Sequence, residues 1–148
     1  MSYITYQTLV DNGSTAVVKI CERFDAANDR FVTAVNTSNL AFANSSLGSK
    51  VSITKIEYAV GFKDGLLKLY WDHGSTPSDI IQLGKTQSGK IQSYIANPLS
   101  VTNDARKGNI NLQVYSTQAN DSYTVIIYMN KEQNFESAYA PYNVPYTS

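Results

Sequence analysis

The stretch SYTVIIYMNK, residues 122–131, decides the fold class of this chain. Tyr123, Val125, Ile127 and Met129 occupy every second position, and this period of two is typical of a β-strand. The positions between them also carry bulky residues. We therefore expect a central strand, or one whose outer face is covered by a partner.

The segment before it has the same period. In residues 108–116, Ile110, Leu112 and Val114 alternate with polar residues, which predicts a strand with one solvated face. The linker at residues 117–121 is short and polar. We therefore expect this segment and residues 122–131 to form an antiparallel hairpin.

Two earlier segments are also predicted to be strands. Residues 15–24 are rich in β-branched and apolar side chains, and they follow the turn sequence Asp11-Asn12-Gly13. Residues 51–60 alternate with one slip at Thr54-Lys55, which indicates a β-bulge.

The middle of the chain adds shorter segments. The turn sequence at residues 63–65 predicts a second hairpin, formed by residues 51–60 and 66–71. Short strands are expected at residues 80–83 and 87–95. No window has a sustained helical period, and residues 26–35 are the best short helical candidate.

These segments predict an all-β fold, an antiparallel β-sandwich of jelly-roll or immunoglobulin-like type with about seven or eight strands. We expect one sandwich domain over residues 1–131 and an extended tail over residues 132–148. The tail has no period and places prolines among aromatic residues. It is expected either to pack on its own domain or to act as an intersubunit arm. The candidate interface residues of the tail are Phe135, Tyr139, Pro141, Tyr142, Pro145 and Tyr146.

The charge balance argues against several classes of partner. Twelve basic and twelve acidic residues cancel, so the chain lacks the positive surface of a nucleic-acid-binding protein. No apolar run approaches the roughly 18 residues of a membrane-spanning segment. The opening residues lack the pattern of a signal peptide. We therefore expect synthesis in a cytoplasm, with no nucleic-acid or membrane partner.

Catalytic constellations are weak. His73 is the only histidine, and it follows Asp72. A hydrolytic dyad there would need a positioned nucleophile, so we interpret His73 as a turn residue. Asp72, His73 and Asp79 do not predict a zinc site, because Cys and His dominate such sites and the chain has one of each. We expect no enzyme activity, no metal and no cofactor.

Aromatic residues are the remaining signal, with eleven tyrosines and one tryptophan. Such side chains pack in strands, contact other proteins or stack on sugars, and all three roles remain open. The candidates for surface contacts are Tyr70, Trp71, His73 and Tyr128.

Two parts of the chain resemble a known class of proteins. The first is QTLVDNGSTAVVKI at residues 7–20. The second runs from residue 51 to 131 and includes VSITKI, LKLYWD, GNINL and NDSYTVII. Both parts resemble small virion structural proteins of tailed bacteriophages, in particular of marine and cyanobacterial phages.

The resemblance implies a β-sandwich that attaches to the phage particle, most specifically a capsid decoration or cement protein. Its expected partners are the major capsid protein, other virion proteins and further copies of itself. Its expected location is the virion, assembled in the cytoplasm of the bacterial host. A tail, neck or baseplate protein is the first alternative, and a carbohydrate-binding β-sandwich module is the second.

Overall fold

The computed structural model describes residues 3–43, 49–72, 78–97, 108–133 and 135. Within these ranges the chain forms seven strands and one short 3-10 helix, and it contains no α-helix. The expected all-β antiparallel fold class is confirmed. The elements are β1 (Tyr3–Asp11), β2 (Thr15–Arg23), β3 (Arg30–Val35), η1 (Thr37–Asn39), β4 (Lys50–Trp71), β5 (Ser78–Ile91), β6 (Ile110–Tyr115) and β7 (Ser122–Gln133).

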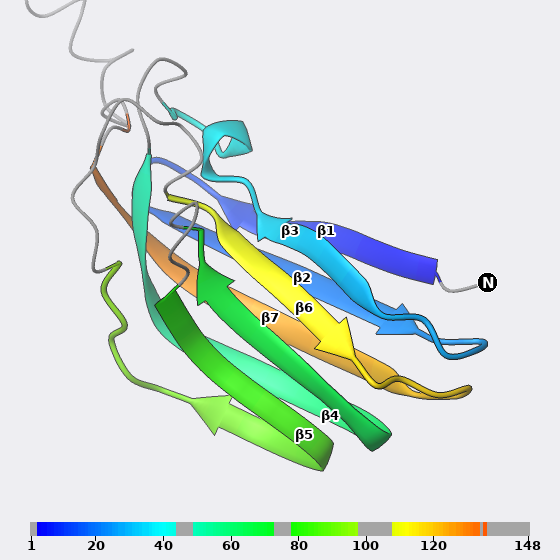
Figure 1. Cartoon of the computed structure of the whole chain (residues 1–148). Coiled ribbons are helices and arrows are strands. Elements are labelled where there is room, and N and C mark those ends of the chain that lie inside the picture. The colour runs from blue at the N-terminus through cyan, green and yellow to red at the C-terminus, as the bar shows by residue number, and fades with distance from the viewer. Residues whose placement is uncertain (1–2, 44–48, 73–77, 98–107, 134, 136–148) are drawn as a thin grey trace, which may run out of the picture.

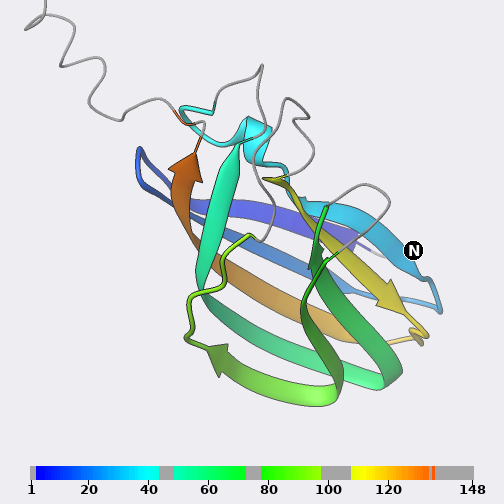
Figure 2. The same cartoon turned by 60° about the vertical axis from the view of Figure 1, so that its left-hand side comes forward.

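All strands belong to one sheet that folds back on itself. The order is β1-β2-β7-β4-β6-β3, with β5 paired to β4. The first half of β4 pairs with β7 and the second half pairs with β6, while β5 follows both halves. The first layer therefore contains β1, β2, β7 and residues 50–61 of β4. The second layer contains β3, β6 and residues 66–71 of β4 (Figures 1 and 2).

β4 bends sharply at residues 62–65, where the sequence predicted a hairpin between residues 51–60 and 66–71. Pairing with β5 passes from Gly61↔Thr86 to Leu66↔Gly84, so residues 62–65 lie opposite Lys85 alone. The Lys63 amide donates to Asp121 Oδ1 at 3.1 Å, which ties the bend to the β6–β7 connection. The chain does reverse direction at residues 63–65, as predicted, but the two halves of β4 lie in different layers (Figures 1 and 2). They pair with β7 and β6 and not with each other, so the predicted hairpin is wrong.

The hairpin predicted for residues 108–116 and 122–131 is not formed either. β6 pairs with β3 and β4, whereas β7 pairs with β2 and β4, so the two strands lie in opposite layers. The connection crosses the sandwich and is held by Phe24, whose amide donates to Asp121 O at 2.8 Å. Two strands that face each other across a core show the same alternation of apolar residues as two strands paired in a hairpin. The sequence pattern therefore could not distinguish the two arrangements. The central position expected for residues 122–131 is confirmed.

Three other local predictions need correction. Residues 30–35 form strand β3, so the helical candidate at 26–35 is wrong. The two strands expected at 80–83 and 87–95 are largely one strand, β5, which ends at Ile91. The solvated face expected on β6 is also wrong in part, because Asn109 and Asn111 are buried.

Two turn and bulge predictions are confirmed. Asn12 Oδ1 accepts hydrogen bonds from the amides of Ser14 and Thr15 at 3.0 and 2.9 Å, which closes the β1–β2 turn. The register of β4 against β7 shifts between Ile53 and Lys55, as a bulge there requires.

The core lies between the two layers. Alternate residues of β2, β7 and the first half of β4 meet alternate residues of β6 and the second half of β4. The large, fully buried side chains include Ile20, Ile53, Ile56, Leu67, Leu69, Trp71, Ile110, Leu112, Ile127 and Met129. Burial of each such side chain contributes about 1.5–3 kcal/mol before the entropy of ordering is counted.

Candidate functional site

Two of the residues that were predicted to lie at the surface are buried. Trp71 is 1% exposed, because β4 directs residues 67, 69 and 71 inward after the bend. Tyr70 is also buried, with its ring 6.0 Å from that of Phe31. The prediction that Tyr70 and Trp71 make surface contacts is therefore wrong.

Two other candidates are held by contacts within the chain. The Tyr128 hydroxyl donates to Glu57 Oε1, and Lys55 Nζ lies 4.1 Å from the Tyr128 ring centroid. The hydrogen bond to Glu57 raises the pKa of Tyr128. Phe135 is half-buried against the core, and its backbone forms a bridge with Ala43.

The remaining candidates are not placed. His73, Tyr139, Pro141, Tyr142, Pro145 and Tyr146 lie outside the described residues, so their predicted roles stay predictions. The expected boundary between domain and tail stays a prediction as well. β7 continues to Gln133, two positions past that boundary.

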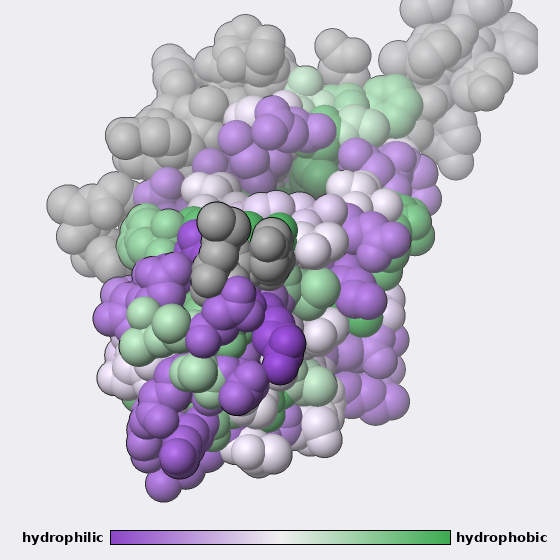
Figure 3. Space-filling model, turned by 90° about the vertical axis from the view of Figure 1, so that its right-hand side faces the viewer, coloured by the Kyte–Doolittle hydropathy of each residue, from purple (hydrophilic) through white to green (hydrophobic). Residues whose placement is uncertain are grey.

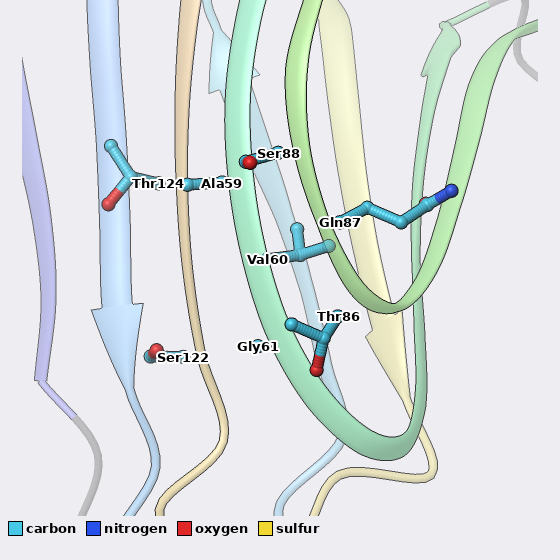
Figure 4. A pocket seen from close by; sticks show the side chains of 8 residues that line it. All are labelled: Ala59, Val60, Gly61, Thr86, Gln87, Ser88, Ser122 and Thr124. Atoms are coloured by element: carbon cyan, nitrogen blue, oxygen red, sulfur yellow. The ribbon is translucent and has the colours of Figure 1, made fainter.

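A shallow cleft of about 370 Å³ lies on the outer face of the first layer, where β7, β4 and β5 run side by side (Figure 4). Its floor is formed by small residues of β4, and hydroxyl groups flank it on both sides. None of its lining residues carries an acid or base, so the cleft lacks the partner that an activated serine or threonine requires. The lining residues are Ala59, Val60, Gly61, Thr86, Gln87, Ser88, Ser122 and Thr124.

A charged cluster is buried between the layers. The Glu22 carboxylate accepts hydrogen bonds from Arg30 Nε at 3.0 Å and from the Tyr123 hydroxyl at 3.1 Å. The hydrogen bond to Glu22 raises the pKa of Arg30, and burial raises that of Tyr123. All of these groups are paired with one another. The cluster links β2 to β3 and β7.

Strand β1 carries a continuous run of exposed residues. Every residue from Thr5 to Val10 is exposed, although a strand of a sandwich normally buries every second side chain. Tyr6, Leu9 and Val10 are 48%, 44% and 40% exposed. Their exposure means that β1 extends past the cover of the second layer. It is an edge strand that pairs only with β2.

A groove of about 310 Å³ lies beneath β1, between the edges of the two layers. β1 and β3 end the sheet order, and both lie on the side opposite β5 (Figure 1). The groove has an apolar floor, and polar groups line its rim. The lining residues are Tyr6, Thr8, Asp11, Val18, Thr33, Ala34, Val35, Asn36, Asn39 and Leu40.

The end of β1 is fixed by a buried lysine. Lys131 Nζ donates to Asp11 Oδ1 at 2.6 Å and to the Ala41 carbonyl at 2.7 Å, and its side chain is almost fully buried. The Asp11 carboxylate in turn accepts from the Ala41 amide. The edge strand and the segment after η1 are therefore held to β7, which gives the groove a fixed shape.

Another region of the surface has a different character. Figure 3 shows the end of the sandwich with the β2–β3 and β6–β7 connections, where hydrophilic residues predominate and hydrophobic ones are scattered. Within the described ranges, no cluster of His, Cys, Asp and Glu could hold a metal ion. No helix among these residues is long and apolar enough to cross a membrane.

Comparisons with known proteins reveal no family. No protein-family model and no curated protein matches the chain. A solved structure of pilus subunits from Bacillus endospore appendages is similar at 9% identity, with 90% of this chain and 92% of the other covered and a TM-score of 0.40. A mutant of a family 29 carbohydrate-binding module is similar at 8% identity, with 97% and 96% covered and a TM-score of 0.41. Likenesses this distant carry no functional argument.

The exposed edge was not among the sequence-predicted sites. A signal for it is present, because residues 3–10 contain no charged residue and no proline. Edge strands usually carry such residues as protection against unwanted pairing. Only the arrangement of the layers shows that this strand is an edge.

Proposed function

We propose that this chain is a non-enzymatic structural protein that binds other protein chains along strand β1. The observation that carries the proposal is the run of exposed residues from Thr5 to Val10 on an edge strand. An edge strand presents unpaired amide and carbonyl groups in a row, which is a template for pairing with an extended segment of another chain.

The chemistry of β1 favours a protein strand as its occupant. Asp11 is the only charged residue of the strand, and Lys131 neutralises it. The one protective feature is the register shift at Leu9, so Tyr3 to Thr8 remain a regular edge. A partner strand can pair there, and its alternate side chains can enter the groove beneath Tyr6. Main-chain bonds supply affinity in this mode, and side-chain pockets supply specificity.

The particular role we propose is that of a capsid decoration or cement protein in the virion of a tailed bacteriophage. The strand and turn sequences at residues 7–20 and 51–131 support it by their resemblance to such proteins. The proposed partners are the major capsid protein, other virion proteins and further copies of this chain. A tail, neck or baseplate position uses the same binding mode and is the alternative within this class.

The absence of net charge is consistent with this role. Twelve positive and twelve negative residues leave no long-range attraction to a partner. Docking must therefore rely on short-range shape matching and strand pairing. We expect binding to depend weakly on salt, unlike that of a charged ligand.

The test uses the double variant Leu9→Lys/Val10→Lys and purified particles of the phage that encodes the chain. Leu9 and Val10 adjoin the regular edge, so two lysines there place charge and bulk beside the strand that would pair with Tyr3 to Thr8. We expect at least about a tenfold loss of co-sedimentation with the particles, which corresponds to about 1.4 kcal/mol. Circular dichroism is expected to show an unchanged fold, because both side chains are exposed.

The matched control is Gln82→Lys, an exposed position on β5 at the far side of the sandwich. It adds the same charge without touching β1, so binding should stay unchanged. Equal binding by the double variant and the unchanged protein would contradict the proposal. A chain that neither joins the particles nor associates with itself would contradict it too.

A further inference from the structure

Besides strand β1, the outer face of the second layer carries a group of solvent-accessible side chains. Phe31 on β3 pairs with Gln113 on β6, which pairs with Lys68 on β4, which in turn pairs with Gln82 on β5. Because their neighbours in each strand face the core, these four side chains share one outer face. At about 4.8 Å per strand, the row spans about 14 Å.

Phe31 is the aromatic residue of this row. It is 65% exposed, and its ring lies 6.0 Å from the buried ring of Tyr70 at an interplanar angle of 54°. Tyr70 supports the Phe31 ring from one side and leaves much of its surface to solvent. An exposed ring held by a second ring is a preformed apolar platform.

Polar groups surround this platform. Gln113 and Gln82 make no side-chain hydrogen bond within the described part of the chain, so their amides are free to bind a ligand. Lys68 Nζ lies 2.9 Å from Asp79 Oδ1, and this pair supplies donors and acceptors with no net charge. The face therefore combines one apolar surface with neutral polar groups.

Asn111 lies beside the platform and contacts Tyr70 through a side-chain hydrogen bond. It lies on this face between Thr33 and Tyr70, and it is 6% exposed. Its Oδ1 has no hydrogen-bond partner in the part of the chain that the structure describes. The contact between Asn111 and Tyr70 helps to fix the ring that supports Phe31.

We propose that this face, the Phe31 platform, binds one or more units of a neutral oligosaccharide. A pyranose ring has an apolar face of C–H groups that can pack on Phe31, and hydroxyl groups at its edge that can pair with Gln113, Lys68 and Asp79. The site is distinct from strand β1 and does not depend on the proposed assembly role.

Other classes of ligand fit this face less well. The Lys68–Asp79 pair cancels its own charge, so nothing attracts a phosphate or a nucleic acid. One exposed phenylalanine is also far smaller than the roughly 800 Å² that each partner contributes to a stable protein interface. A sugar ring matches both the size and the polarity.

The test starts with an array of neutral and charged oligosaccharides that includes linear hexamers of glucose, mannose and N-acetylglucosamine. Glycans that bind are then titrated by calorimetry against the whole chain. Loss of the Phe31 ring in Phe31→Ala should weaken binding by about tenfold or more, whereas Phe31→Trp should retain it. Gln113→Ala should weaken it by a few-fold.

The matched control is Tyr94→Ala, which removes an aromatic ring that is 63% exposed elsewhere on the surface. Its affinity should equal that of the unchanged chain. Leu9→Lys should also bind the glycan normally, which separates this site from the assembly surface. The proposal is overturned if no neutral glycan binds at millimolar concentration, if only charged glycans bind, or if Phe31→Ala and Tyr94→Ala bind equally well.

Discussion

At the scale of single residues, two buried polar clusters hold the sandwich together. Glu22 is paired with Arg30 and Tyr123 between the layers, and Lys131 is paired with Asp11 at the end of β1. Burial of a charge costs several kcal/mol unless partners compensate for it. Each cluster therefore stabilises the fold only while its partners remain in place.

Ionisation of Tyr123 is expected to lower the free energy of unfolding at alkaline pH. Burial raises the pKa of Tyr123 well above the value of about 10 that it has in the unfolded chain. The folded state then keeps a proton that the unfolded state releases. The stabilisation is complete below about pH 10, and each further pH unit lowers the free energy of unfolding by up to about 1.4 kcal/mol.

Urea unfolding between pH 8 and 11 checks this expectation. The unchanged chain should lose stability above about pH 10, and Tyr123→Phe should show a shallower decline. At neutral pH the variant should be less stable by about 2 kcal/mol, because the hydrogen bond to Glu22 is lost. Identical slopes for both proteins would refute the proposed role of Tyr123.

Lys131 provides a second test at this scale. In Lys131→Met the apolar stem is kept, but Asp11 loses its ion pair and the Ala41 carbonyl loses a donor. We expect a loss of about 2–4 kcal/mol in the free energy of unfolding. Lys90→Met, at an exposed position, is the control and should change stability by less than about 0.5 kcal/mol. Equal stability of the two variants would show that the cluster contributes nothing.

At the scale of elements, the bend of β4 decides the architecture. The strand contributes its first half to one layer and its second half to the other, so the bend sets the position of the core. Gly65 lies at this bend. An added Cβ there would sit 3.2 Å from Tyr115 O and 3.3 Å from Phe62 Cγ, which is too close for easy accommodation.

We therefore expect Gly65→Ala to lower the free energy of unfolding by about 1–3 kcal/mol, as overpacking does in other cores. Gly61→Ala is the matched control within the same strand. Its added Cβ would lie 3.7 Å from Ser122 Oγ, an ordinary contact, so stability should change little. Chemical denaturation of both variants makes the comparison. A Gly65→Ala protein as stable as Gly61→Ala would show that the bend tolerates side chains.

The sequence predicted strands better than their connections. Alternation identified residues 122–131 as a central strand and placed the bulge near Thr54, because both features depend on which side chains face the core. It did not distinguish a hairpin from a crossing between layers. Residues 63–65 turn the chain from one layer into the other, and Asp121 supports that bend from a distant part of the sequence.

The candidate sites were harder to predict than the strands. Trp71 and Tyr70 were expected at the surface, but the continued alternation after the bend turns Trp71 into the core. The exposure of β1 depends on how far the second layer extends, and no local pattern contains that information. Phe31 became prominent only when the best short helical candidate, residues 26–35, proved to contain an edge strand.

At the scale of the whole molecule, the two layers are closed on the side of β5 and open between β1 and β3. The closed side shares strands between the layers. The open side exposes a strand edge and a groove. We infer that this asymmetry directs partners to one side, while the outer face of the second layer remains free to hold a sugar.

The most direct test is a cryo-EM reconstruction of the native particle at a resolution that separates strands. We predict density for an added strand about 4.8 Å from Tyr3 to Thr8, contributed by another protein chain. A reconstruction in which this edge faces solvent on every copy, or in which the chain is missing from the particle, would contradict the central claim.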